Sequence, residues 1–105
     1  MSRSPTTTDP DWLENEHAGQ LLASEFIEPM GLSAVELAAA VSVPLERLNA
    51  MIAGTAAVDA ELDLRLCRYF GMSDGFFMRL QLQYEMLEAK RALNGELDRI
   101  VPRAA

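Results

Sequence analysis

Few side chains of this 105-residue chain have the type and spacing for chemistry. Arg47 can donate to a base edge or a phosphate, whereas the neighbouring Glu46 can accept from cytosine but repels phosphate. His17 and Cys67 are the single histidine and the single cysteine, and no nucleophile or carboxylate lies at a spacing that identifies a catalytic partner. We therefore expect no catalytic residue, no metal site and no cofactor. His17 is expected at a helix start, and Cys67 as a small buried hydrophobe.

A helix-turn-helix pattern over residues 31–70 would position Arg47. Ser33 and Glu36 have the spacing of a capping box, so Ser33 is expected to be an N-cap and not a nucleophile. Pro44 suits the first position of the following helix, and Gly54 suits a left-handed stop at its end. The positions of that helix at core spacing are Leu48, Met51 and Ile52. An unrelated bundle of four or five helices is the alternative.

Two more helices are predicted on either side of this pair. The first spans residues 18–28 and ends near Pro29, which lacks an amide donor and disfavours a helical residue before it. The second spans residues 60–70, with Asp59 as its N-cap and Gly71 at its end. Its core spacing is shown by Leu62, Leu66, Tyr69 and Phe70.

The longest helix is predicted at residues 74–94, after Ser73, and it carries two apolar stripes. One stripe contains Phe77, Leu80, Tyr84 and Leu87. The other contains Leu82, Met86, Ala89 and Leu93. Two stripes are more than one small bundle can bury, so we predict a homodimer formed through this helix.

The fold class predicted from these elements is all-α, with a single domain over residues 12–94. Residues 1–11 are small, polar and interrupted by two prolines, which predicts a disordered N-terminal tail. Residues 95–105 are predicted to form a C-terminal extension. No apolar run approaches the roughly 20 residues of a membrane span, and the lone cysteine fits a reducing compartment, so we expect no membrane contact and a cytoplasmic location.

The charge of the chain is acidic and unevenly distributed. The formal net charge is −7, and residues 1–32 hold six acids against one base. The only basic cluster is Lys90 and Arg91, whereas nucleic-acid-binding domains usually present a basic stripe. Charge alone argues against DNA, and the acidic front half would attract a basic protein partner.

Arg65 and Arg68 leave two alternatives open. They can contact phosphate, which would add to a DNA-binding surface. Alternatively, they can be solvated partners of Glu61 and Asp63 on the same helix.

A family resemblance extends over about residues 17–91. Its motifs are His17-Ala18-Gly19-Gln20-Leu21-Leu22, Phe26-Ile27-Glu28-Pro29-Met30-Gly31-Leu32-Ser33, Glu36-Leu37-Ala38, Val43-Pro44, Arg47-Leu48-Asn49, Gly54, Leu64-Arg65-Leu66, Arg68-Tyr69-Phe70-Gly71, Phe76-Phe77, Leu80-Gln81 and Tyr84. These motifs resemble the HigA/VapI antitoxins, which belong to the lambda-repressor-like (XRE) class of helix-turn-helix proteins.

The resemblance implies a five-helix lambda-repressor-like DNA-binding domain with a long C-terminal helix. It also implies a dimeric, non-catalytic repressor that binds a double-stranded operator, represses its own operon and neutralises a partner RNase toxin. By motif position, the helix after Pro44 is the recognition helix. The residues then expected to face the major groove are Leu45, Glu46, Arg47, Asn49 and Ala50, and those expected to approach phosphate are Ser33 and Ala34.

The chain departs from the family pattern after Gly54. Family members usually continue with a basic pair that contacts phosphate, and here Thr55 and Ala56 stand instead. Thr55 stays among the expected DNA contacts, but each missing phosphate contact lowers affinity and flattens its salt dependence. We therefore expect weak operator binding. The alternative is a protein-interaction module that keeps the fold and has lost most DNA binding.

Overall fold

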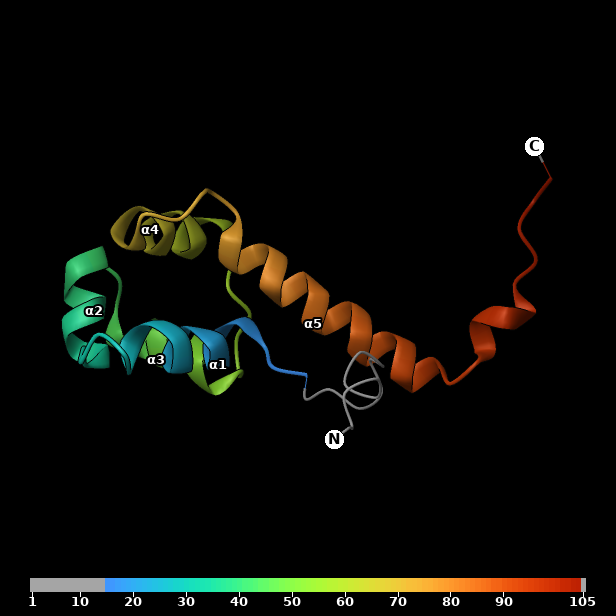
Figure 1. Cartoon of the computed structure of the whole chain (residues 1–105), viewed down its shortest axis with the longest axis horizontal. Helices are drawn as coiled ribbons and strands as arrows, with labels where there is room; N and C mark the ends of the chain where they lie inside the picture. Colours follow the sequence, from blue (N-terminus) through green and yellow to red (C-terminus); the bar gives the residue numbers. More distant parts are fainter. Residues whose placement is uncertain (1–14, 105) are drawn as a thin grey trace, which may run out of the picture.

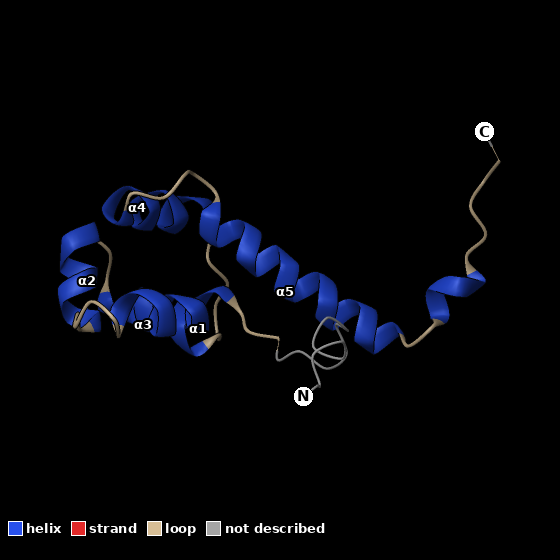
Figure 2. Cartoon of the chain, in the orientation of Figure 1, coloured by secondary structure: helices blue, strands red, loops and turns tan. Residues whose placement is uncertain are grey.

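The chain folds as an all-α domain, seen here in a computed structural model that describes residues 15–104. Within that range the α-helices are α1 (Ala18–Leu22), α2 (Ala34–Val41), α3 (Leu45–Ala53), α4 (Ala60–Phe70) and α5 (Phe76–Leu93). No strand occurs in the described range (Figure 2), so the predicted fold class is confirmed. The N-terminal tail predicted at residues 1–11 lies outside the described residues.

Two short segments extend these helices. A π-helical segment, η3 (Ala23–Ile27), continues α1, and the Glu28 amide donates to the Ala23 carbonyl at 2.9 Å. Nothing in the sequence pattern predicts this wider turn within the helix expected at residues 18–28. After α5, Asn94 and Gly95 adopt left-handed conformations, and a 3₁₀ turn, η4 (Glu96–Arg99), follows.

The start of α2 has the predicted capping box. The Ser33 hydroxyl accepts from the Glu36 amide at 3.1 Å, and the Glu36 carboxylate accepts from the Ser33 amide at 2.9 Å. The turn to α3 is made by Ser42, which has a φ of 61°. Pro44, predicted as the first helical residue, is instead the N-cap of α3, so the helix begins one residue later, and Gly54 ends it with a φ of 82°. The predicted helix-turn-helix unit is therefore confirmed.

One hydrophobic core joins α1 through α4 to the first turn of α5. Its buried members are Ala18, Leu22, Ile27, Leu37, Ala38, Val41, Val43, Leu48, Met51, Val58, Leu62, Leu66, Cys67 and Phe77. Burial raises the pKa of the Cys67 thiol, so it stays protonated, as expected of a small hydrophobe. Tyr69 was predicted at core spacing, but it is 44% exposed, because it faces a groove beside α2.

The start of α5 differs most from the prediction. The helix begins at Phe76 instead of directly after Ser73, and no local side chain caps it. Asp63 of α4 does so from a distance: its carboxylate accepts from the amides of Gly75 at 2.6 Å, Phe77 at 2.8 Å and Met78 at 3.0 Å. Asp63 is 2% exposed. The idea that Asp63 is a solvated partner of an arginine is therefore wrong.

His17 has the structural role expected of it. Its Nδ1 accepts from the amides of Gly19 at 3.0 Å and Gln20 at 3.3 Å, so it caps α1. The ring meets Tyr84 of α5 edge-on, with 5.7 Å between centroids. A Cβ at Gly54 would lie 2.6 Å from His17 Nε2. The histidine thus joins α1, the end of α3 and α5.

After its first turns α5 extends away from the other helices (Figure 1), and its second apolar stripe is exposed. Phe77 is buried, and Leu80 packs against the core. On the other stripe Leu82 is 57% and Met86 52% exposed. The exposed apolar residues continue into the C-terminal extension as Leu97, Ile100 and Val101. Among residues 15–104, no helix has both the length and the hydropathy to cross a membrane.

Candidate nucleic-acid interface

The outer face of α3 is built from four of its nine residues. A helix turns about 100° per residue, so burial of Leu48 and Met51 directs the opposite face to solvent. That face contains Glu46, Asn49, Ala50 and Ala53. Leu45 lies at its edge and is 38% exposed. Four of the five residues predicted to face the major groove are thus together on one surface.

Arg47, the fifth, lies on the flank of α3 that faces α4. Its Nη2 contacts both carboxylate oxygens of Asp59, the N-cap of α4. Its Nη1 lies 3.5 Å from the Glu61 carboxylate. The hydrogen bond to Asp59 raises the pKa of the Arg47 guanidinium. The pKa of Asp59 is lowered, first by the Leu62 amide and then by Arg47. The strongest donor predicted on the recognition helix is therefore engaged within the chain.

The ion pairs continue from Glu61 to the end of α2. The second oxygen of Glu61 lies 3.1 Å from Arg65 Nε, and Arg65 Nη1 donates to the Val41 carbonyl at 3.0 Å. Of the two alternatives for Arg65, pairing with Glu61 is confirmed. We call Arg47, Asp59, Glu61 and Arg65 the α3–α4 ion cluster. It holds two positive and two negative groups and is neutral.

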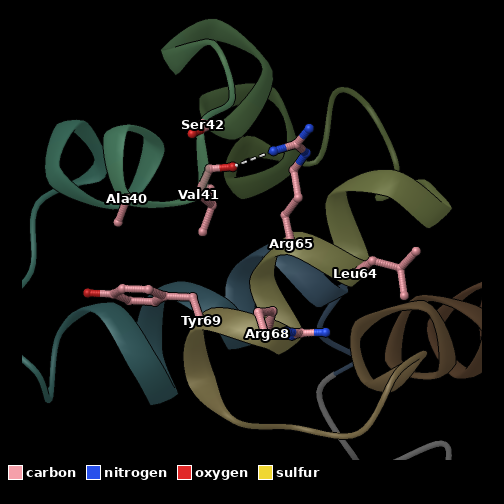
Figure 3. A pocket seen from close by; sticks show the side chains of 7 residues that line it. All are labelled: Ala40, Val41, Ser42, Leu64, Arg65, Arg68 and Tyr69. Carbon is pink, nitrogen blue, oxygen red and sulfur yellow. Dashed lines mark hydrogen bonds between the residues drawn. The ribbon is translucent and has the colours of Figure 1, made fainter.

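Figure 3 shows the groove next to this cluster, between the end of α2 and the outer side of α4. Its volume is about 410 Å³, and it is lined by Ala40, Val41, Ser42, Leu64, Arg65, Arg68 and Tyr69. No residue of α3 lines it. Arg68 makes no ion pair with the described residues, so its alternative role as a phosphate contact stays a prediction.

The remaining predicted contacts lie at the helix ends on either side. The Ser33 hydroxyl accepts from Glu36, which leaves its proton available for a phosphate oxygen. Ala34 begins α2 next to it. Thr55 is different, because its hydroxyl donates to the Ala50 carbonyl at 3.3 Å and its amide donates to the same oxygen at 2.9 Å. Both Thr55 donors thus bind a carbonyl in the last turn of α3 and are not directed to solvent.

The sequence pattern missed the partners of Arg47. Asp59 was identified as an N-cap, which is confirmed by its 2.9 Å bond from the Leu62 amide. A cap fixes the carboxylate at the start of α4, and the short loop after Gly54 brings that start back to α3. An aspartate N-cap a few residues after the glycine that ends α3 is therefore the sequence signal that could have identified Asp59 as a partner of Arg47. Among residues 15–104 there is also no group of three or more His, Cys, Asp or Glu side chains that could hold a metal ion.

Comparison with known proteins identifies the family. No protein-family model matches the chain. Virulence-associated protein I of Dichelobacter nodosus is 36% identical to it over 75 residues, which are 71% of this chain and 69% of that protein. The chain belongs to the HigA/VapI family of helix-turn-helix antitoxins.

Solved structures agree with this assignment to the HigA/VapI family. The Pseudomonas aeruginosa protein PA4674 in complex with its operator DNA matches with a TM-score of 0.81 and 30% identity, over 88% of this chain and 98% of that one. The P. aeruginosa antitoxin HigA with the higBA promoter matches with a TM-score of 0.77 and 27% identity, over 88% and 100%. The resemblance seen in the sequence motifs is confirmed.

Proposed function

We propose that this HigA/VapI-type chain is a non-catalytic, DNA-binding transcriptional regulator that binds an operator and represses its own operon. The observation that carries the proposal is the match of the whole α1–α5 domain to a protein in complex with its operator DNA. The α2–turn–α3 geometry supports it, because a two-helix unit with an exposed second helix is the usual reader of the major groove.

In this proposal the outer face of α3 enters the major groove. Leu45, Glu46, Asn49 and Ala50 approach base edges, while Ser33 and Ala34 approach phosphate from the start of α2. Thr55 can take part only if its hydroxyl turns away from the Ala50 carbonyl. Arg47 supplies the strongest positive charge. With so few donors, binding is expected to be weak and to depend on dimerisation.

A salt series of binding to the upstream DNA of the gene tests this function. We expect sequence-specific binding at low salt, and we expect Arg47→Ala to lower the affinity and reduce the salt slope by about one phosphate contact. Arg99→Ala is the matched control, since it removes one positive charge from the exposed η4 turn. Equal slopes for the wild type and Arg47→Ala would refute the assignment of Arg47. Absence of specific binding by folded wild type would refute the function.

We propose further that the chain neutralises a basic RNase toxin. Membership of an antitoxin family supports a toxin partner, and the net charge of −7 favours a basic one. The second candidate function, a protein-interaction module without DNA binding, is favoured by one observation: the α3–α4 ion cluster is neutral. Recovery of a basic partner by the wild type, together with no operator binding at low salt, would favour the second candidate.

The dimer is proposed to form through the outer stripe of α5. Met78 and Leu82 line a groove of about 380 Å³ with Ala57 and Val58, and the exposed stripe continues to Met86. A second copy that covers this face would remove a large apolar surface from water. The same contact would place two α3 helices for two operator half-sites.

Leu82→Glu is expected to convert the dimer to a monomer, because it puts a charge into the centre of the apolar stripe. Light scattering after gel filtration measures the mass directly. Gln83→Glu is the matched control, since it adds a charge at the next position, which is also exposed but outside the stripe. A dimer that survives Leu82→Glu and is as stable as the control would place the interface elsewhere.

A further inference from the structure

The flank of α3 that faces α4 shows why this recognition helix has so little available positive charge. Arg47 is present, but Asp59 holds its guanidinium through two oxygens and Glu61 lies 3.5 Å away. Its side chain is 31% exposed, against 62% for Asp59 and 60% for Glu61. The two carboxylates are thus more open to solvent than the cation they neutralise.

The carboxylates are fixed in place, whereas the arginine can change partner. Asp59 accepts from the Leu62 amide at 2.9 Å, at a helix N-terminus that favours negative charge. Glu61 is held by Arg65 at 3.1 Å, and Arg65 is itself anchored on the Val41 carbonyl at 3.0 Å. The contacts of Arg47 in the α3–α4 ion cluster are its two ion pairs, which a phosphate can replace with equivalent bonds.

We propose that Asp59 and Glu61 are internal competitors of DNA for Arg47 and thereby set the operator affinity of this protein. The inference rests on the proposed function. A phosphate that binds Arg47 must break the bidentate carboxylate contact and then lies near two uncompensated negative charges. Thr55 and Ala56 stand where a basic pair is usual, so two phosphate donors are missing from this surface. The α3–α4 ion cluster then holds Arg47, a donor that is present, away from phosphate. Both carboxylates act as positioning residues, since they reach DNA only through Arg47.

The proposal is tested with a double variant in which both carboxylates are replaced by amides of the same size. Asp59→Asn keeps an N-cap of about equal strength, and Glu61→Gln keeps the side-chain length. We expect the double variant to bind the operator about tenfold more tightly at low salt, because a phosphate that contacts Arg47 no longer has to displace two carboxylates. The matched control is Glu96→Gln with Asp98→Asn, which removes two negative charges from η4, far along the chain.

Adding Arg47→Ala to the double variant identifies the cause of any gain. If the carboxylates act through Arg47, the gain in affinity disappears in the triple variant. If the gain persists, general relief of negative charge explains it and the inference is wrong. Circular dichroism melts confirm that each variant is folded.

The two proposals fail in different ways. Wild-type binding with no gain in the Asp59→Asn, Glu61→Gln variant refutes competition and leaves the DNA-binding function intact. Absence of specific binding by both folded proteins at low salt refutes the function and the competition together. Binding by the double variant alone would refute the function proposed for the wild type and would support the competition, since the carboxylates would then prevent binding completely.

Discussion

Replacing Asp63 by alanine is expected to lower the free energy of unfolding by about 3 kcal/mol, because one buried and two partly buried amides are left without an acceptor. The carboxylate is 2% exposed and accepts from the amides of Gly75, Phe77 and Met78. These amides lie at the start of α5, where no local side chain caps the helix. A loss of this size would lower the melting temperature by more than about 10 °C in a domain of this length.

Urea or thermal unfolding followed by circular dichroism measures this loss. Asp74→Ala is the matched control, because Asp74 is exposed in the same connection between α4 and α5. Asp63→Asn should fall between the two, since an amide keeps one acceptor oxygen but not the charge. If Asp63→Ala melts within about two or three degrees of the control, the buried cap contributes little to stability and Asp63 does not hold the start of α5.

Replacing Gly19 by alanine is expected to cost about 3 kcal/mol, at the upper end of the range for overpacking, because the collision is with backbone. A Cβ at Gly19 would lie 1.8 Å from the Met51 carbonyl oxygen and 2.8 Å from the Ile52 Cα. No side-chain rotation relieves such contacts. The methyl group would force α1 away from α3, and it would disturb the helix proposed to read DNA.

The control for Gly19→Ala is Gly31→Ala. Gly31 has a φ of 66°, and a Cβ added there would have nothing within 4 Å, so its substitution introduces backbone strain of about 1–2 kcal/mol and no collision. We expect the midpoint of unfolding to fall clearly further for Gly19→Ala, with weaker operator binding at temperatures where the variant is still folded. Equal midpoints would show that α1 and α3 can separate at little cost.

Local signals predicted most of the fold. The Ser33 box, the Asp59 cap and the Gly54 stop each depend on residues within one helical turn, so their spacing in the sequence was sufficient. The start of α5 was misplaced because its cap comes from Asp63, 12 residues before Gly75. Asp63 lies among charged neighbours in its helix, so its sequence context predicted exposure.

The part of the candidate site that depends on local spacing was also predictable from the sequence. The outward direction of Glu46, Asn49 and Ala50 follows from helical spacing alone. The position of Arg47 does not, because it depends on how α4 returns to α3 and brings Asp59 within reach. The close approach of α1 to α3 at Gly19 is likewise a property of two packed backbones. Such long-range contacts leave no periodic trace in a single sequence.

The cap that α4 provides to α5 has a consequence for cooperativity. The first turn of α5 gains its hydrogen-bond acceptor only after α4 has folded and docked, so an isolated α5 lacks this stabilisation at its start. Its opening is therefore coupled to the opening of the core, and the two should exchange amide protons as one unit. The surface proposed for pairing with a second copy then exists only on a folded domain.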